Sequence, residues 1–166
     1  MGGGGVRKER EATAYHEAGH AVACVVLRLP VVSVDIVPQE DRLGYCRFDR
    51  PDPDGAPTWQ RDHFLRDHLT IILAGPAAEI RRFPGHRWCI FLGDSDDIAC
   101  ARTEHQALHE TNPQMAGEDW DDWFRVAQGL VKDEWQAITA VATALLERGE
   151  LTGEEVKQII GGGGTP

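Results

Sequence analysis

The feature that most constrains the fold is a helical pattern in residues 8–29, which ends at Pro30. The apolar residues that recur at the spacing of one buried helix face are Ala18, Val22, Val25 and Leu29. From residue 21 to residue 27 every side chain is apolar, so this part of the helix has no face suited to water. We therefore expect a helix that is buried on several sides and passes through the middle of the domain.

The opposite face of this helix carries the polar residues of "ATAYHEAGHAVA", residues 12–23. Residues i and i+4 project from one face of a helix, so the imidazoles of His16 and His20 can bind the same metal ion. Glu17 lies one residue further round, where a carboxylate can take a proton from a metal-bound water without being a ligand. The pattern predicts a zinc site with Glu17 as general base. The alternative is an ordinary helix with two structural or exposed histidines.

A catalytic zinc ion usually has three protein ligands and one open position, so a third ligand must come from elsewhere in the chain. Two stretches contain acidic residues at suitable places. The first, "LAGPAAEI" at residues 73–80, contains Glu79. The second, "LGDSDDIA" at residues 92–99, contains Asp94, Asp96 and Asp97. The residues alone leave this choice open.

The other paired histidines have a simpler interpretation. His105 and His109 lack a glutamate after the first histidine and stand in a charged helix, which favours a solvated face. His63 and His68 are five residues apart and belong to another polar face, so we expect no functional role for them.

The pattern of the whole chain predicts an α+β fold that is mainly helical, with one small sheet. Residues 31–37 are β-branched with partial alternation and residues 43–48 follow a polar turn, which together predict an antiparallel strand pair. Residues 59–80 have helical spacing, but Pro76 lacks an N–H group. We therefore expect a kink or a restart of this helix at Gly75 and Pro76.

Three further helices are expected towards the C-terminus. The first is capped at residue 94 or 95 and continues to residue 109. The second is long, spans residues 119–147 and ends at Gly149. Thr152 and Glu155 have the spacing of a capping box, which predicts that a short final helix begins there.

We expect a single domain at residues 9–160, between flexible tails at residues 1–8 and 161–166. The glycine runs 2–5 and 161–164 cannot bury side chains and lose the most backbone entropy on ordering. A composition of 42% hydrophobic and 27% charged residues is typical of a soluble globular domain.

Charge and cysteine content limit the partners and the location. A net charge of −10 disfavours a nucleic-acid partner, because such binding depends on clustered Lys and Arg. No apolar run approaches the roughly 20 residues that span a bilayer, and no signal-peptide pattern is present, so we expect a cytoplasmic location without a membrane segment. The four cysteines have no CxxC spacing, which favours free thiols.

Four segments together resemble the peptidase domain of FtsH-type ATP-dependent zinc metalloproteases. They are "ATAYHEAGHAVA", "VDIVPQEDRLGYC", "LAGPAAEI" and "GDSDDIACA", in matching order and spacing between Ala12 and Arg102. In that family the last segment carries a zinc-binding aspartate directly before an isoleucine or leucine, which falls on Asp97 before Ile98. The resemblance implies a zincin-like domain whose Zn²⁺ ligands are His16, His20 and Asp97.

The resemblance has two local departures and one large one. Pro76 stands where the family usually has arginine, and Asp96 stands where it usually has asparagine. The chain also contains no GxxxxGK[ST] loop for nucleotide phosphates. We therefore expect the protease half alone, in a stand-alone form without the ATPase module.

The leading hypothesis is a zinc metalloendopeptidase that hydrolyses peptides or unfolded polypeptides without an ATPase of its own. An extended substrate could add to the sheet edge formed by residues 43–48, which predicts Leu43, Gly44 and Tyr45 as substrate-binding residues. The alternative is a catalytically silent zinc-binding regulatory or interaction module of the same fold. A homo-oligomer and a separate ATPase partner both remain open.

Overall fold

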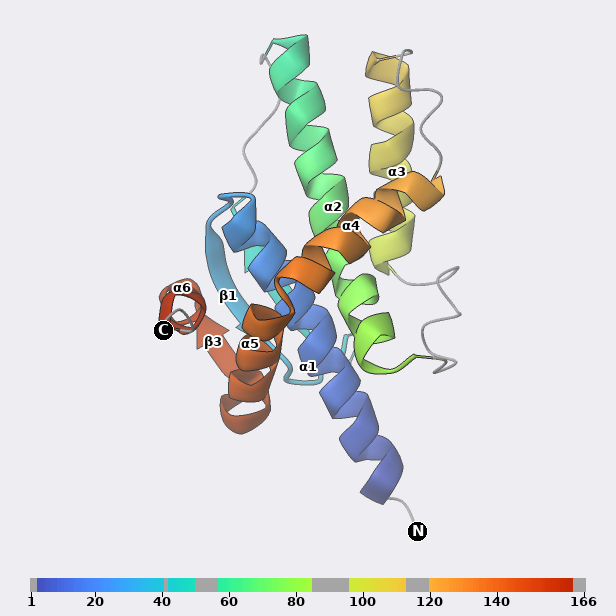
Figure 1. Ribbon diagram of the computed structural model, residues 1–166. Helices are drawn as coiled ribbons and strands as arrows, with labels where there is room; N and C mark the ends of the chain where they lie inside the picture. The colour runs from blue at the N-terminus through green and yellow to red at the C-terminus, as the bar shows by residue number, and fades with distance from the viewer. Residues whose placement is uncertain (1–2, 41, 50–56, 85–95, 113–119, 163–166) are drawn as a thin grey trace.

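The computed structural model describes residues 3–40, 42–49, 57–84, 96–112 and 120–162 (Figure 1). In chain order the elements are α1 (Gly3–Val26), β1 (Val31–Asp35), β2 (Tyr45–Phe48), α2 (Thr58–Arg82), α3 (Asp96–Thr111), α4 (Trp120–Asp133), α5 (Trp135–Arg148), β3 (Glu150–Thr152) and α6 (Gly153–Gly162). The predicted mainly helical α+β fold with one small sheet is confirmed.

Helix α1 is the element around which the others are arranged. Helices α2 and α5 and the sheet all pack against it. The residues of α1 that have no exposed surface are Ala14, Ala18, Ala21, Val22, Ala23 and Cys24. The apolar stretch read from the sequence is therefore buried in its first half, residues 21–24, as predicted, whereas Val26 is 41% exposed and Val25 and Leu27 are half-buried. The helix begins at Gly3, five residues before the predicted start at residue 8.

The C-terminal end of α1 shows why the helix stops before Pro30. Arg28 has a left-handed φ of 62°, and its N–H donates to the carbonyl of Val25 at 3.1 Å. The N–H of Leu29 donates to the carbonyl of Cys24 at 2.8 Å. These two bonds are the Schellman arrangement, which usually places glycine at the left-handed position. Because arginine stands there instead, the sequence predicted an end at residue 29 rather than at Val26.

The sheet has three strands in the order β2-β1-β3, and both pairings are antiparallel. The pairing of β1 with β2 confirms the predicted strand pair, with Asp35 opposite Tyr45 and Val34 opposite Cys46. Strand β3 was not predicted, because three residues are too few to show alternation. Its position leaves β2 at one edge of the sheet.

The long helix predicted at residues 119–147 is wrong: the chain forms two helices that meet at Glu134. Figure 1 shows α4 crossing α2, whereas α5 lies beside α1, and these are the contacts that the two helices make. A straight helix could not bury its apolar face against both partners. The break is therefore a consequence of packing, since neither proline nor glycine stands at residue 134.

Helix α2 runs through Gly75 and Pro76 without interruption, so of the predicted kink or restart the restart is wrong and the kink stays a prediction. All residues from 68 to 78 are buried, which offsets the backbone hydrogen bond that proline cannot make. The predicted cap of α3, at residue 94 or 95, lies outside the described residues.

The predicted capping box at the start of α6 is confirmed. The N–H of Thr152 donates to Glu155 Oε2 at 2.8 Å, and the N–H of Glu155 donates to Thr152 Oγ1 at 3.3 Å. Helix α6 continues to Gly162, into the predicted C-terminal tail. In the part of the chain that the structure describes, no helix combines the length and apolar character required to cross a membrane.

Candidate metal centre

The candidate metal centre lies between α1 and the first turn of α3. His16 Nε2 is 2.8 Å from Asp97 Oδ2, and His20 Nε2 is 3.6 Å from the same oxygen. The three side chains each present a ligand atom, and these atoms lie within 4.8 Å of one another. The fold thus brings Asp97 to the two histidines across about eighty residues of sequence.

The other nitrogen of each imidazole is held by a residue of α2. His16 Nδ1 lies 3.1 Å from Glu79 Oε2, and His20 Nδ1 lies 2.8 Å from the carbonyl oxygen of Ile71. A carbonyl oxygen only accepts, so His20 Nδ1 carries a proton and donates it to Ile71, and Nε2 is the nitrogen that faces Asp97. Zinc-binding histidines are typically oriented in this way, by a carboxylate or a backbone carbonyl behind the ring. The donor set therefore fits zinc.

Glu79 is placed differently from Asp97. Both carboxylates contact His16, but Glu79 faces Nδ1 and Asp97 faces Nε2. Only Asp97 lies on the side of the ring to which His20 Nε2 also points. Of the acidic candidates from the sequence, Asp97 joins the cluster, Glu79 lies behind it and Asp94 lies outside the described residues. The side chain of Asp96 is not among those that the structure describes.

Helix α2 can pack on the histidine face because glycine occurs at both contact points. A Cβ atom on Gly19 would lie 2.5 Å from the carbonyl oxygen of Ala74. A Cβ atom on Gly75 would overlap His20 Nε2 and lie 2.9 Å from His16 Cδ2. Any larger residue at position 75 would push α2 away from the rings and from the hydrogen bonds that orient them.

Burial and close charges change the acidity of every group in the cluster. Burial lowers the pKa of His16, but hydrogen bonds with Asp97 and Glu79 outweigh it and raise that pKa to about 10. For His20, burial is likewise outweighed by Asp97, so its pKa is raised. Burial would raise the pKa of Asp97, yet both histidines hold it well below its usual range. Burial raises the pKa of Glu17, although the histidines oppose this.

Glu17 is a residue of α1, and its side chain packs against Gly44, next to the start of the edge strand β2. Its residue is only 8% exposed, and a Cβ atom on Gly44 would lie 2.8 Å from Glu17 Cγ. Leu43 and Tyr45, on either side of that glycine, are about half exposed at 48% and 50%. Of the three residues predicted to bind substrate, Tyr45 begins the edge strand β2, and Leu43 and Gly44 lead into it beside the buried carboxylate.

The prediction that His68 belongs to a polar surface is wrong. His68 is 5% exposed and its Nδ1 lies 3.2 Å from Oε1 of Glu104, which is 8% exposed. The rings of Phe48 and Phe64 lie 5.8 Å and 6.0 Å from that of His68. Sequence reasoning missed this pair because α3 covers the face of α2 that the spacing indicated as polar.

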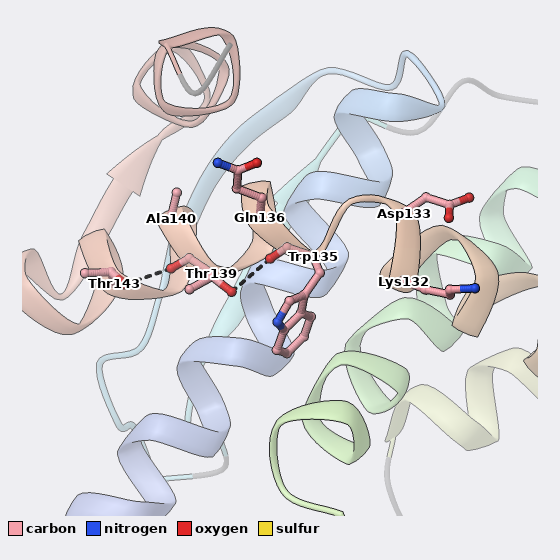
Figure 2. A pocket seen from close by; sticks show the side chains of 7 residues that line it. All are labelled: Lys132, Asp133, Trp135, Gln136, Thr139, Ala140 and Thr143. Carbon is pink, nitrogen blue, oxygen red and sulfur yellow. Dashed lines mark hydrogen bonds between the residues drawn. The ribbon is translucent and has the colours of Figure 1, made fainter. Parts of the chain in front are cut away.

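Two other features lie apart from the centre. A shallow hollow at the end of α4 and along α5, shown in Figure 2, is lined by Lys132, Asp133, Trp135, Gln136, Thr139, Ala140 and Thr143. Its two threonine hydroxyls already donate to carbonyls of their own helix at 2.8 Å, so they offer no free donor.

Cys24, Cys46 and Cys100 are free thiols, as predicted for these three.

Comparison with known proteins identifies the family to which this site belongs. Residues 6–108 match the model of peptidase family M41, a span that includes most of α1, all of α2 and the candidate metal ligands. The chain therefore belongs to peptidase family M41.

Its relatives include proteins named ATP-dependent zinc metalloprotease FtsH. FtsH 1 of Symbiobacterium thermophilum is 32% identical over 92% of this chain and 29% of its own length. The Caldicellulosiruptor bescii protein is 25% identical over 92% of this chain and 30% of its own length. The Chlamydia trachomatis protein is 37% identical over 52% of this chain and 8% of its own length. The chain thus spans less than a third of the length of each of these relatives.

Proposed function

We propose that this chain is a zinc-dependent metalloendopeptidase domain that hydrolyses peptide bonds in peptides and unfolded polypeptides and needs no ATP to do so. The observation that carries the proposal is the geometry of His16, His20 and Asp97. Three ligand atoms lie within 4.8 Å of one another, and the outer nitrogens of both imidazoles are already engaged. Membership of family M41 supports the same conclusion.

His16, His20 and Asp97 would hold the metal ion. Zinc, when bound there, supplies a Lewis acid that polarises the scissile carbonyl group and increases the acidity of water. The protein groups around it orient the ligands: Glu79 and the carbonyl of Ile71 fix the two rings, as described above.

Glu17 is the general base in this proposal. It follows His16 directly on α1, and its carboxylate interacts electrostatically with His16, His20 and Asp97. Because burial raises its pKa, its carboxylate is a better proton acceptor than a solvated glutamate. Glu17 takes the proton of the attacking water and then delivers it to the leaving amine.

The edge strand β2 supplies the surface for the substrate. An extended polypeptide can pair with the open edge through main-chain hydrogen bonds, which read the backbone and demand little of the side chains. Gly44 lies against Glu17, so a chain that continues this pairing passes beside the base. This arrangement favours an endopeptidase with broad specificity. It also favours catalysis over a silent zinc-binding module, which has no need of a buried carboxylate beside an open strand.

The proposed activity is cytoplasmic and independent of ATP. The buried thiols of Cys24 and Cys46 are reduced, which suits the cytoplasm, where thiols stay reduced. The 166-residue chain contains no phosphate-binding loop, so its own peptidase activity does not depend on nucleotide hydrolysis.

Replacing Glu17 with glutamine tests the proposal. The amide has nearly the same shape, so Glu17→Gln should fold and bind zinc like the wild type. Because it cannot accept a proton, hydrolysis of a quenched peptide should fall by about 100-fold or more. Glu9→Gln, an exposed change two turns earlier on α1, is the matched control and should retain full activity. Undiminished hydrolysis by zinc-loaded Glu17→Gln would refute the role of the base.

A further inference from the structure

Helix α3 carries Asp97 in its first turn, so its position along α2 decides whether this carboxylate reaches the histidines. Figure 1 shows α2 and α3 side by side. Among the described elements, α2 is the main packing partner of α3. A shift of α3 by one helical turn, about 5.4 Å, would remove Asp97 from the 2.8 Å contact with His16.

Apolar packing alone would fix the position of α3 along α2, its register, only weakly. The buried apolar face of α3 consists of Ile98, Ala101 and Leu108, and small or aliphatic residues of this kind can repack after a shift. Glu104 lies on the same face, two turns beyond Asp97, and is nearly as buried as these residues. A buried carboxylate is costly without a partner, so its position on α2 is strongly restricted.

Facing Glu104 on α2 is His68, whose Nδ1 lies 3.2 Å from Glu104 Oε1, a close contact between two buried polar groups without the alignment of a hydrogen bond. The rings of Phe48 and Phe64 lie against His68, so its orientation is also restricted. A second polar contact follows in the antiparallel direction, where Asn112 Nδ2 donates to Asp62 Oδ2 at 2.9 Å. A shift of α3 along α2 by one helical turn would separate both of these pairs.

We propose that His68 and Glu104 form a positioning pair, which sets the register of α3 on α2 and thereby holds Asp97 at the metal centre. Neither residue belongs to the ligand cluster, and the pair acts through the helix that connects Glu104 with Asp97. The inference rests on the zinc site proposed above. A buried polar pair of this kind contributes specificity of packing, and its replacement by apolar residues is often neutral or stabilising.

This difference between specificity and stability allows a decisive test with the full chain. The variant His68→Leu/Glu104→Met replaces the pair with apolar side chains. Zinc affinity is measured by competition with a chromophoric chelator, coordination by the visible spectrum of bound Co²⁺, and stability by the Tm of the metal-free chain. We expect the dissociation constant of zinc to rise about tenfold, as it does when groups that orient ligands are lost. The Tm should stay the same or rise.

Two further variants make the result interpretable. Leu108→Ala leaves the pair intact but opens a cavity on the same face of α3, so its Tm should fall while its zinc affinity stays within about twofold of wild type. Glu104→Gln keeps the size of the side chain and removes its charge, so it should fold and show a smaller loss of zinc affinity than the double variant. If the double variant does not fold, Glu104→Gln provides the deciding measurement.

The possible failures are distinguishable. Wild-type chain that binds no zinc would contradict the proposed metal site itself. Wild-type zinc affinity and Co²⁺ spectra in both pair variants would overturn only the positioning role. An equal loss of affinity in Leu108→Ala would also overturn it, because general packing of α3 would then be sufficient.

Discussion

At the scale of single residues, His16 has a different carboxylate on each nitrogen. Asp97 is 2.8 Å from Nε2, on the side shared with His20, whereas Glu79 is 3.1 Å from Nδ1. Removing a carboxylate that binds the metal ion takes away a ligand. Removing a carboxylate that only orients an imidazole leaves all the ligands in place and lowers the affinity for the metal.

Removing these carboxylates one at a time should therefore separate their roles. Asp97→Ala should lose stoichiometric zinc after dialysis against a weak chelator. Glu79→Ala should retain zinc with an affinity reduced by about 10- to 100-fold. Metal content by atomic absorption and affinity by chelator competition measure the two effects. If Glu79→Ala loses all metal and Asp97→Ala keeps it, the assignment of the third ligand is wrong.

Gly75 is predicted to be the least replaceable residue of α2. The Cβ atom in Gly75→Ala would overlap the ring of His20, and α2 would have to move. We expect a loss of about 1–3 kcal/mol in the free energy of unfolding, measured with urea, together with weaker zinc binding. Gly129→Ala is the matched control, since nothing lies within 4 Å of its added Cβ atom. In the exposed part of α4 it should stabilise the chain by about 0.5–1 kcal/mol. Equal stability of the two variants would contradict the packing argument.

At the scale of elements, the hydrogen-bond directions of the sheet show which groups of β2 are open. The N–H of Ile36 donates to Gly149 near β3, and the N–H of Asp49 donates to Pro30 near β1. Backbone groups alternate in direction along a strand, so those of Tyr45 face β1 and those of Cys46 and Phe48 face the open edge. Tyr45 would therefore contact a substrate through its exposed side chain rather than its main chain.

This alternation predicts a period of two in the response to modified substrates. In a series of peptides with one N-methylated amide each, a methyl group on an amide that faces β2 removes one hydrogen bond. Cleavage should fall several-fold at every second position near the scissile bond and change little at the positions between. The rate of cleavage at the same bond, followed by mass spectrometry, is the measurement. A uniform response along the peptide would exclude pairing with β2.

At the scale of the whole molecule, the proposed peptidase centre lies in a 166-residue sequence that contains no GxxxxGK[ST] loop for nucleotide phosphates. Because its own residues cannot unfold a substrate by ATP hydrolysis, it should cleave a flexible protein such as casein and leave a stably folded protein intact. Addition of ATP should change neither result. Cleavage is followed by gel electrophoresis, with Glu17→Gln as the control for contaminating proteases. Cleavage of the folded protein that depends on ATP would show that a partner motor takes part.

The sequence by itself determined the features that depend on residues close together along the chain. His16, Glu17 and His20 share one turn of helix, Thr152 and Glu155 satisfy each other's backbone groups, and residues 31–48 contain both the strands and their turn. Local geometry is sufficient for each of these, because helical rotation and strand alternation hold wherever the element lies. The resemblance to a known family then indicated Asp97, which spacing alone had left open among several acidic residues.

Tertiary structure decided the features that depend on contacts between distant residues. The side of His16 that Glu79 occupies, the burial of His68 under α3, the break at Glu134 and strand β3 each depend on what the rest of the chain places nearby. Packing energy exceeds the small differences in local propensity, so it can divide a periodic helix or bury a histidine on a face that reads as polar. The spacing of His16 and His20 on one helix face is a local property of this sequence, whereas their cluster with Asp97 exists only where α1, α2 and α3 meet.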